Sequence, residues 1–225
     1  MQPFAYIDLY CERLGPGLWA EPVNALSNAG FIMAGWLAWR RLGADAAGAP
    51  RDLRLLALLM ALIGVGSFIF HTTARVATAY LDSGFIALYL VSYVCIWLAR
   101  VQGVPWPRAL WGAPGFVAFA AVASAAVLSL RIPALNSDVA MYVSAWLALA
   151  MMSLASLRRD RAAAGGLALT LACFTVSLTL RQIDLPLCEH WPLGTHFLWH
   201  LINALALWCS WRALRQTAAG RATER

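Results

Sequence analysis

The chain has 225 residues, of which 61% are hydrophobic and only 12% are charged, whereas a soluble domain carries about 25% charged residues. This composition excludes an ordinary soluble globular domain and predicts a protein embedded in a membrane. The formal net charge of +6 comes entirely from arginine, because the sequence contains no lysine. The arginines flank apolar segments, so the positive charge does not indicate a nucleic-acid partner.

Seven apolar segments, each about 18 to 22 residues long, are long enough to cross the ~30 Å hydrocarbon core of a bilayer. They lie at residues 25–43, 53–72, 79–99, 112–130, 138–157, 163–183 and 194–212. We therefore predict an all-α integral membrane protein in which seven transmembrane helices form a single domain over residues 1–225. Residues 1–24 would form an acidic outer segment, and residues 213–225 a basic tail.

The distribution of arginine predicts the orientation of these helices. Thirteen of the 17 positive charges fall after the first, third and fifth segments or in the C-terminal tail. Under the positive-inside rule, these connections face the cytoplasm, which leaves the N-terminus outside. The alanine- and arginine-rich, lysine-free composition suggests a bacterial source, so we expect an inner-membrane protein whose outer side faces the periplasm.

The outer segment before the first helix contains three carboxylates, Asp8, Glu12 and Glu21. Gly15-Pro16-Gly17 allows a tight turn that brings Glu12 back toward Glu21. Oxygen ligands of this kind can bind a hard cation such as Ca²⁺, and the alternative is an ordinary solvated surface. We expect Cys11, in the same segment, to lie on the same side as Cys188, where an oxidising compartment would permit a disulfide.

The second segment ends with a serine and a histidine, Ser67 and His71, which lie four residues apart and therefore on one helical face. The predicted topology places His71 at the outer end of this helix. Gly64 and Gly66, just before them, leave space for a neighbouring helix to approach closely.

Asp82 opens the third segment at the same predicted depth as His71. An unpaired carboxylate inside a membrane is energetically costly, so it should have a partner. Arg75 is one candidate partner, and a metal site is the other. At the end of the sixth segment, Arg181 and Asp184 are three residues apart, and we expect them to form an ion pair.

The seventh segment begins with His196 and His200, which share one face of a helix. Two imidazoles at this spacing provide half of a metal site, although they could also line a polar seam between helices. The topology brings His71 to the same depth, so the three histidines converge. Since three protein ligands suffice for a catalytic zinc, His190 is not needed as a fourth.

Several motifs, in this order, resemble those of the alkaline ceramidases. These enzymes belong to a wider group of seven-helix membrane hydrolases that includes the adiponectin-receptor-like proteins. The motifs are YCE at 10–12, EPVNALSN at 21–28, GVGSFIFH at 64–71, Asp82, RQIDLPLC at 181–188 and HFLWH at 196–200.

The resemblance implies a zinc bound by His71, His196 and His200, with Ser67 and Asp82 as catalytic residues. It implies hydrolysis of the amide bond in a ceramide-like N-acyl lipid within the membrane. Two positions depart from the family pattern: Ser83 stands where a second acid often follows the aspartate, and Leu9 where the calcium-binding members carry an aspartate. Two alternatives stay open, a lipid esterase or phospholipase with the same zinc chemistry and a seven-helix receptor with a structural zinc.

Overall fold

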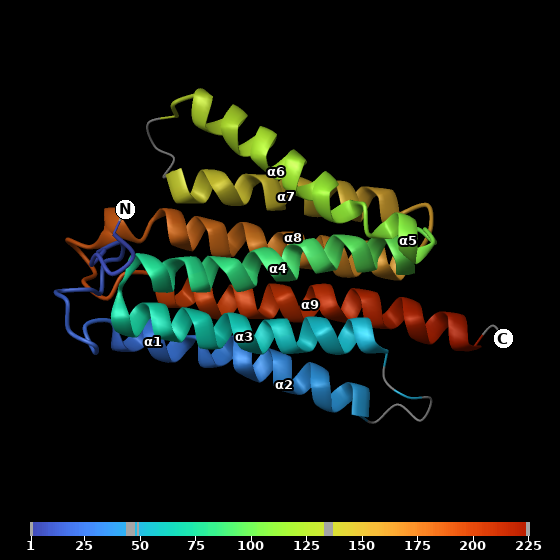
Figure 1. The fold of residues 1–225 in the computed structure, drawn as a ribbon, viewed down its shortest axis with the longest axis horizontal. Coiled ribbons are helices and arrows are strands. Elements are labelled where there is room, and N and C mark those ends of the chain that lie inside the picture. Colours follow the sequence, from blue (N-terminus) through green and yellow to red (C-terminus); the bar gives the residue numbers. More distant parts are fainter. Residues whose placement is uncertain (1, 44–47, 49, 133–136, 224–225) are drawn as a thin grey trace.

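The computed structural model describes residues 2–43, 48, 50–132 and 137–223, and most of them are helical (Figure 1). Within these residues no strand forms, and Tyr6 and Arg75 make an isolated β-bridge. The helices are α1 Pro22–Ser27, α2 Ala29–Gly43, α3 Arg51–Thr73, α4 Val76–Arg100, α5 Trp106–Ala109, α6 Gly112–Ser129, α7 Ser137–Ser156, α8 Arg161–Gln182, the 3-10 helix η1 Leu185–Leu187, and α9 His196–Thr223.

The first predicted segment is divided between two helices, α1 and α2. At the junction, the Asn28 N–H donates to the Ala25 carbonyl over 3.3 Å, and the Phe31 N–H donates to the Asn28 carbonyl over 3.1 Å. These hydrogen bonds connect residues three apart, as in a 3-10 turn. The turn separates α1 from α2. The other six predicted segments fall on α3, α4, α6, α7, α8 and α9.

Four helical stretches of the described chain are long and apolar enough to cross a membrane: Arg51–Thr73, Val76–Arg100, Trp106–Ser129 and Arg161–Gln182. Met141–Ser156 is a shorter apolar helix. At 1.5 Å per residue, the 15 residues of α2 extend only about 22 Å. The structure thus supports a helical membrane protein, while the seven-span count and the orientation of the termini remain predictions.

Helix α9 lies at the centre of the bundle and packs against α1, α2, α3, α4 and α8 (Figure 1). Its Trp211 is fully buried, and the indole N–H donates to the Leu53 carbonyl of α3 over 3.1 Å. Helix α6 is at the periphery, where it packs against α4 and α7 and buries none of its residues. The bundle therefore has a tightly packed centre around α9 and a loosely attached edge at α6.

Two glycines let the helices around α3 approach closely, as the sequence predicts. A Cβ on Gly64 would lie 2.8 Å from the Asn28 carbonyl oxygen, and a Cβ on Gly66 would lie 2.9 Å from the ring of Phe85 and 3.5 Å from the Cα of Asp82. Residues two apart point to opposite sides of a helix. Gly64 thus admits the α1–α2 junction on one side of α3, and Gly66 admits α4 on the other.

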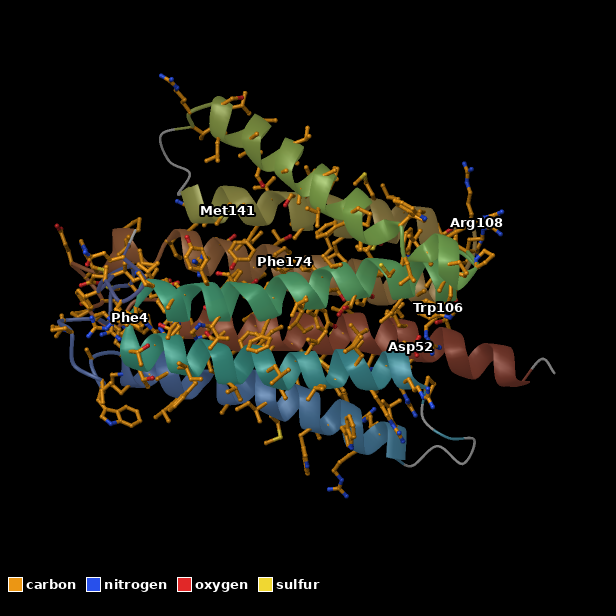
Figure 2. All side chains as sticks on the ribbon, in the orientation of Figure 1. Phe4, Asp52, Trp106, Arg108, Met141 and Phe174 are labelled. Carbon is orange, nitrogen blue, oxygen red and sulfur yellow. A yellow bond between two sulfur atoms is a disulfide. The ribbon has the colours of Figure 1, made fainter. Side chains whose placement is uncertain are left out.

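The two ends of the bundle differ in their chemistry. Phe4 lies at one end and Asp52 and Arg108 at the other (Figure 2). At the latter end, the Arg100 guanidinium forms two hydrogen bonds of 2.5 and 2.6 Å with the Asp52 carboxylate. Arginines also stack there on tryptophan rings, in the pairs Arg40–Trp36, Arg41–Trp208, Arg54–Trp39 and Arg215–Trp211.

Candidate metal centre

The structure brings together three histidines at the end of the bundle that holds the N-terminus. His71 lies in the last turn of α3, while His196 and His200 lie in the first two turns of α9. None is more than 2% exposed, and one ligand nitrogen from each lies within 4.8 Å of the others. Among the described residues, this is the one group of three or more potential ligands placed to bind a metal.

Hydrogen bonds determine which ring nitrogens remain available. The Nδ1–H of His71 donates to Glu21 Oε2 over 2.6 Å, and its Nε2 is buried without a partner. The Ser27 hydroxyl donates to the Asn24 carbonyl, so the His200 Nδ1 that lies 2.7 Å from Ser27 Oγ must carry the proton. His196 also has a buried nitrogen, Nδ1, without a partner.

This donor set fits zinc. Three imidazoles bind catalytic zinc in many proteins and leave a fourth position open. Ligand histidines generally donate their second N–H to a carboxylate, a carbonyl or another oxygen acceptor. His71 and His200 follow this pattern, and the partnerless nitrogens of His71 and His196 are costly to bury unless something binds them.

Glu21 is the carboxylate that orients His71. It is 2% exposed, and it accepts hydrogen bonds from Arg13 and from Asn24 as well as from the histidine. Burial alone raises the pKa of this carboxyl. The hydrogen bond and charge of His71, together with the hydrogen bonds from Arg13 and Asn24, outweigh burial and lower the pKa below its ordinary value.

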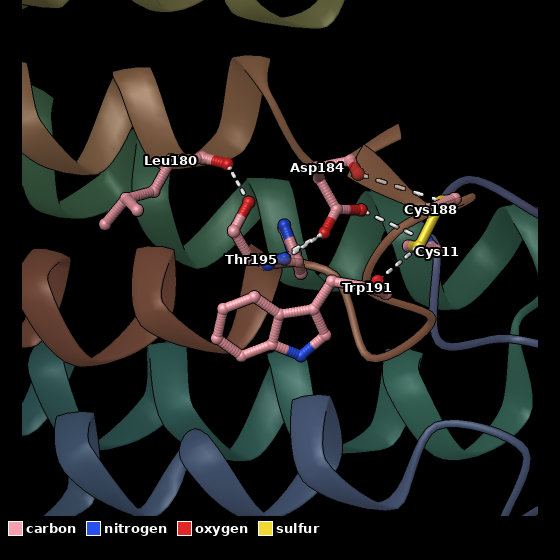
Figure 3. The surroundings of a disulfide bond; sticks show 7 residues. Cys11, Leu180, Asp184, Cys188, Trp191 and Thr195 are labelled. Atoms are coloured by element: carbon pink, nitrogen blue, oxygen red, sulfur yellow. Dashed lines mark hydrogen bonds between the residues drawn. A yellow bond between two sulfur atoms is a disulfide. The ribbon is translucent and has the colours of Figure 1, made fainter. Parts of the chain in front are cut away.

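Asp184 holds the start of α9 in place. Its Oδ1 accepts the N–H groups of Thr195 over 2.7 Å and of His196 over 2.9 Å, and its Oδ2 accepts the N–H of Cys11 over 3.1 Å (Figure 3). A carboxylate at a helix N-terminus satisfies otherwise unpaired N–H groups and complements the helix dipole. Asp184 thus fixes the backbone of His196.

The Asp184 carboxylate accepts backbone N–H groups through both of its oxygens, and its predicted ion pair with Arg181 stays a prediction. The Arg181 guanidinium donates to the Tyr10 hydroxyl over 3.2 Å and lies over the rings of Tyr10 and Trp199. Tyr10 stacks on the His196 ring with a centroid distance of 3.7 Å. Burial raises the pKa of Tyr10 despite the charge of Arg181, so the ring packs on His196 as a neutral phenol.

A disulfide connects the N-terminal segment to the loop before α9. Cys11 and Cys188 are joined, with their Cα atoms 5.4 Å apart (Figure 3). The bond lies beside Asp184 and directly follows Tyr10 in the chain. Tyr10 and Asp184, the two residues that position His196, therefore both lie next to the disulfide.

A cavity of about 170 Å³ adjoins the histidines. Ser67, Asp82, His196 and His200 line it together. Asp82 has one buried carboxylate oxygen, Oδ1, with no hydrogen-bond partner. The alternative partner for Asp82 is wrong, since Arg75 is exposed and donates to the Phe4 carbonyl over 2.7 Å.

A second, apolar cavity of about 70 Å³ adjoins the first. The two cavities share Phe31, Ile63, Ile86, Tyr142 and Asn203 as lining residues. Two tyrosines bound the far part of the second cavity and bond Ser210: the Tyr89 hydroxyl lies 2.8 Å from Ser210 Oγ, and the Tyr93 hydroxyl donates to the Ser210 carbonyl over 2.9 Å. The two cavities thus lie side by side, and the apolar chamber is lined mainly by residues of α4, α7, α8 and α9.

The acidic residues predicted to bind calcium have separate partners. Asp8 is exposed and accepts the Tyr6 hydroxyl over 3.3 Å. Glu12 accepts the N–H groups of Val23 and Asn24 at the start of α1, each over 2.7 Å. Glu21 is engaged by Arg13 and His71. His190 is exposed and lies outside the histidine group.

The sequence did not predict the contacts by which four residues support the histidines: Tyr10, Arg13, Ser27 and Asp184. Ser27 carries a usable signal, because it lies three residues after Asn24 on a helix that opens beside the acidic segment. Asp184 lies eleven residues before Thr195, so the local capping pattern does not predict its contact with the start of α9. Nothing local predicts the contact of Arg13 with the His71 carbonyl or that of Tyr10 with Arg181, since the residues of each pair are more than 50 positions apart.

Comparisons with known proteins agree with this geometry. A family model described as Ceramidase matches residues 10–222, which includes every residue of the histidine group and its supports. A comparison with curated proteins finds no match. Because the family model covers nearly the whole chain, this protein belongs to the ceramidase family.

Proposed function

We propose that this protein is a zinc-dependent membrane amidase that hydrolyses a ceramide-like N-acyl lipid to a fatty acid and a long-chain amine. The observation that supports this proposal best is the 170 Å³ cavity, which His196, His200 and Asp82 line together. One carboxylate oxygen of Asp82 is buried there without a hydrogen-bond partner. Membership of the ceramidase family supports the amide bond as the target.

His71, His196 and His200 would hold the zinc, which supplies a Lewis acid that activates water at neutral pH. Asp82 accepts a proton from the attacking water and returns it to the nitrogen of the leaving amine. The Ser67 hydroxyl donates a hydrogen bond to the carbonyl oxygen as it gains negative charge. One water is consumed, and its oxygen ends in the carboxylic acid.

The second cavity supports a lipid as the substrate. An acyl chain whose carbonyl lies beside Asp82 has an apolar path toward Tyr93, which is 11 residues further along α4, or about 16 Å at the helical rise. Such a lipid would enter sideways from the outer leaflet without crossing water. The site would then face the periplasmic side of a bacterial inner membrane.

The test is lipid mass spectrometry on purified protein in mixed micelles, with N-acyl sphingoid bases, matched fatty-acid esters and phospholipids as parallel substrates. We expect the fatty acid and free amine from the amide, at a rate abolished by a zinc chelator and restored by zinc. Selective cleavage of the esters would instead favour the related lipid esterase. No turnover of any lipid by zinc-loaded protein would favour the receptor.

A further inference from the structure

Arg13 is a buried cation within the acidic N-terminal segment. Its side chain is inaccessible to solvent, and Glu21 is its ion-pair partner among the residues that the structure describes. All three guanidinium nitrogens point at oxygen atoms. Nε bonds Glu21 Oε1, Nη1 donates to the carbonyls of Gly15 over 2.9 Å and Gly17 over 3.3 Å, and Nη2 donates to the His71 carbonyl over 2.6 Å.

These four oxygens, one carboxylate and three backbone carbonyls, are the ligand types that a calcium ion collects in proteins. The Gly15-Pro16-Gly17 turn directs two carbonyls inward, yet they surround a guanidinium. The remaining buried acid, Glu12, has both oxygens occupied by N–H groups of α1. The buried acids of this segment are thus satisfied by groups of the chain itself, and the set does not fit an added cation.

We propose that Arg13 is a built-in cation that makes this segment independent of calcium and positions the zinc ligand His71. Arg13 contacts His71 by two routes, directly through the backbone carbonyl and indirectly through Glu21, whose other oxygen accepts the Nδ1–H. The first route holds the backbone of His71, and the second engages its Nδ1, so that Nε2 is the nitrogen left for the metal. The independence from calcium stands on its own, whereas the positioning role rests on the zinc site proposed above.

The first measurement is calorimetric titration of calcium into purified wild-type protein, together with thermal unfolding in calcium and in a calcium-selective chelator. We expect no binding heat at concentrations up to about 1 mM, the weak end of protein calcium sites, and equal unfolding temperatures in both buffers. Saturable binding of one calcium per chain, or a higher unfolding temperature in calcium, would overturn the proposal. This result does not depend on any variant folding.

The second measurement is zinc affinity, read by competition with a chromophoric chelator and by the visible spectrum of the cobalt-substituted protein. Arg13→Ala should weaken zinc binding by about 10–100-fold, the usual effect of removing a supporting partner of a ligand. Arg75→Ala, which removes an exposed arginine from the same end, should leave the affinity unchanged. Wild-type zinc affinity in Arg13→Ala would refute the positioning role.

A double-mutant cycle with Glu21→Gln separates positioning from a general loss of packing. If Arg13 acts through Glu21, the effects of the two substitutions on zinc affinity should be clearly less than additive. Additive effects would contradict the proposed route. If Arg13→Ala does not fold, Arg13→Lys replaces it in the cycle, because a lysine keeps the charge but cannot bridge the same oxygens. Neither measurement uses hydrolysis, so a failure of the proposed activity would leave both interpretable.

Discussion

At the scale of single residues, neighbouring side chains constrain all three histidines of this site. Glu21 and Ser27 accept the Nδ1–H groups of His71 and His200, while Tyr10 packs against the ring of His196. Such contacts fix the ring orientation before any ligand arrives, which reduces the entropy lost on binding a metal.

Zinc content should depend on all three histidines. Purified protein should contain about one zinc per chain, and His71→Ala, His196→Ala and His200→Ala should each lose it, because two imidazoles bind zinc far more weakly than three. Elemental analysis of each purified variant measures this. His190→Ala is the matched control and should retain its zinc. Full zinc in two of the three variants would disprove the assignment.

Asp82 and Ser67 should affect turnover and leave zinc binding intact. Asp82→Asn should lower kcat by about 10²–10⁴-fold, the usual contribution of a positioned acid–base group. Ser67→Ala should lower it by up to about 10²–10³-fold, as for the loss of one oxyanion donor. Initial rates on zinc-loaded, folded variants provide the measurement. Wild-type turnover by such an Asp82→Asn protein would exclude the mechanism.

The spacing of His196 and His200 predicts that they share a helix face, and the arginine asymmetry predicts that His71 lies at the same depth, so the histidine group could be predicted from the sequence. The supports of that group were not predictable in the same way. Arg13 reaches the His71 carbonyl across 58 residues, and Cys11 reaches Asp184 across 173. Contacts of this kind follow from how the loops cover the end of the bundle. Periodicity and local spacing carry no information about that arrangement.

At the scale of elements, the first turn of α9 is stabilised by a single carboxylate. Asp184→Ala would leave three buried N–H groups without their acceptor, and each such loss costs about 1–3 kcal/mol. We expect a lower unfolding temperature and weaker zinc binding, measured on purified protein in detergent. Asp8→Ala removes an exposed acid and should change neither. An unfolding temperature equal to wild type in Asp184→Ala would contradict this role.

The chamber between α4, α7, α8 and α9 should set the preferred acyl length. Ala148 on α7 lines the apolar cavity but not the polar one. Ala148→Phe would fill it, so kcat/KM for long acyl chains should fall about 10-fold or more relative to short chains, as expected for a pocket that rejects extra methylenes. Competition assays with mixed-chain substrates measure the ratio. Ala118→Phe, on an exposed position of α6, is the control. An unchanged chain-length profile would place the acyl chain elsewhere.

At the scale of the whole molecule, hydropathy predicts the positions of the helices well, since all seven predicted segments fall on helices of the structure. It predicts their internal breaks poorly. The division between α1 and α2 arises where Gly64 admits the Asn28 carbonyl, and a close approach between helices is invisible to a window average. The short helix α5 was also not predicted, although Pro105 and Pro107 fit the start of a helix.

The orientation of the chain can be tested with reporters at its ends. If the arginine-rich connections face the cytoplasm, a fluorescent protein fused to the C-terminus should fluoresce, and alkaline phosphatase fused there should be inactive. Alkaline phosphatase fused to the N-terminus behind an export signal should be active. Reversing the charge bias, by adding arginines to the loop between α3 and α4, should reduce this asymmetry. An active C-terminal phosphatase in the wild-type protein would refute the predicted topology.

The disulfide between Cys11 and Cys188 also bears on the order of biosynthesis. The two cysteines are separated by 177 residues, so at about 5–20 residues per second the ribosome needs roughly 10–35 s to make the second after the first. During this interval the N-terminal segment has no loop to join, and His71 has no partner from α9. The histidine group can therefore assemble only once the last helix has been inserted. A prematurely terminated chain exposes an unpaired thiol and charged side chains that the complete fold buries, and quality-control proteases can recognise both.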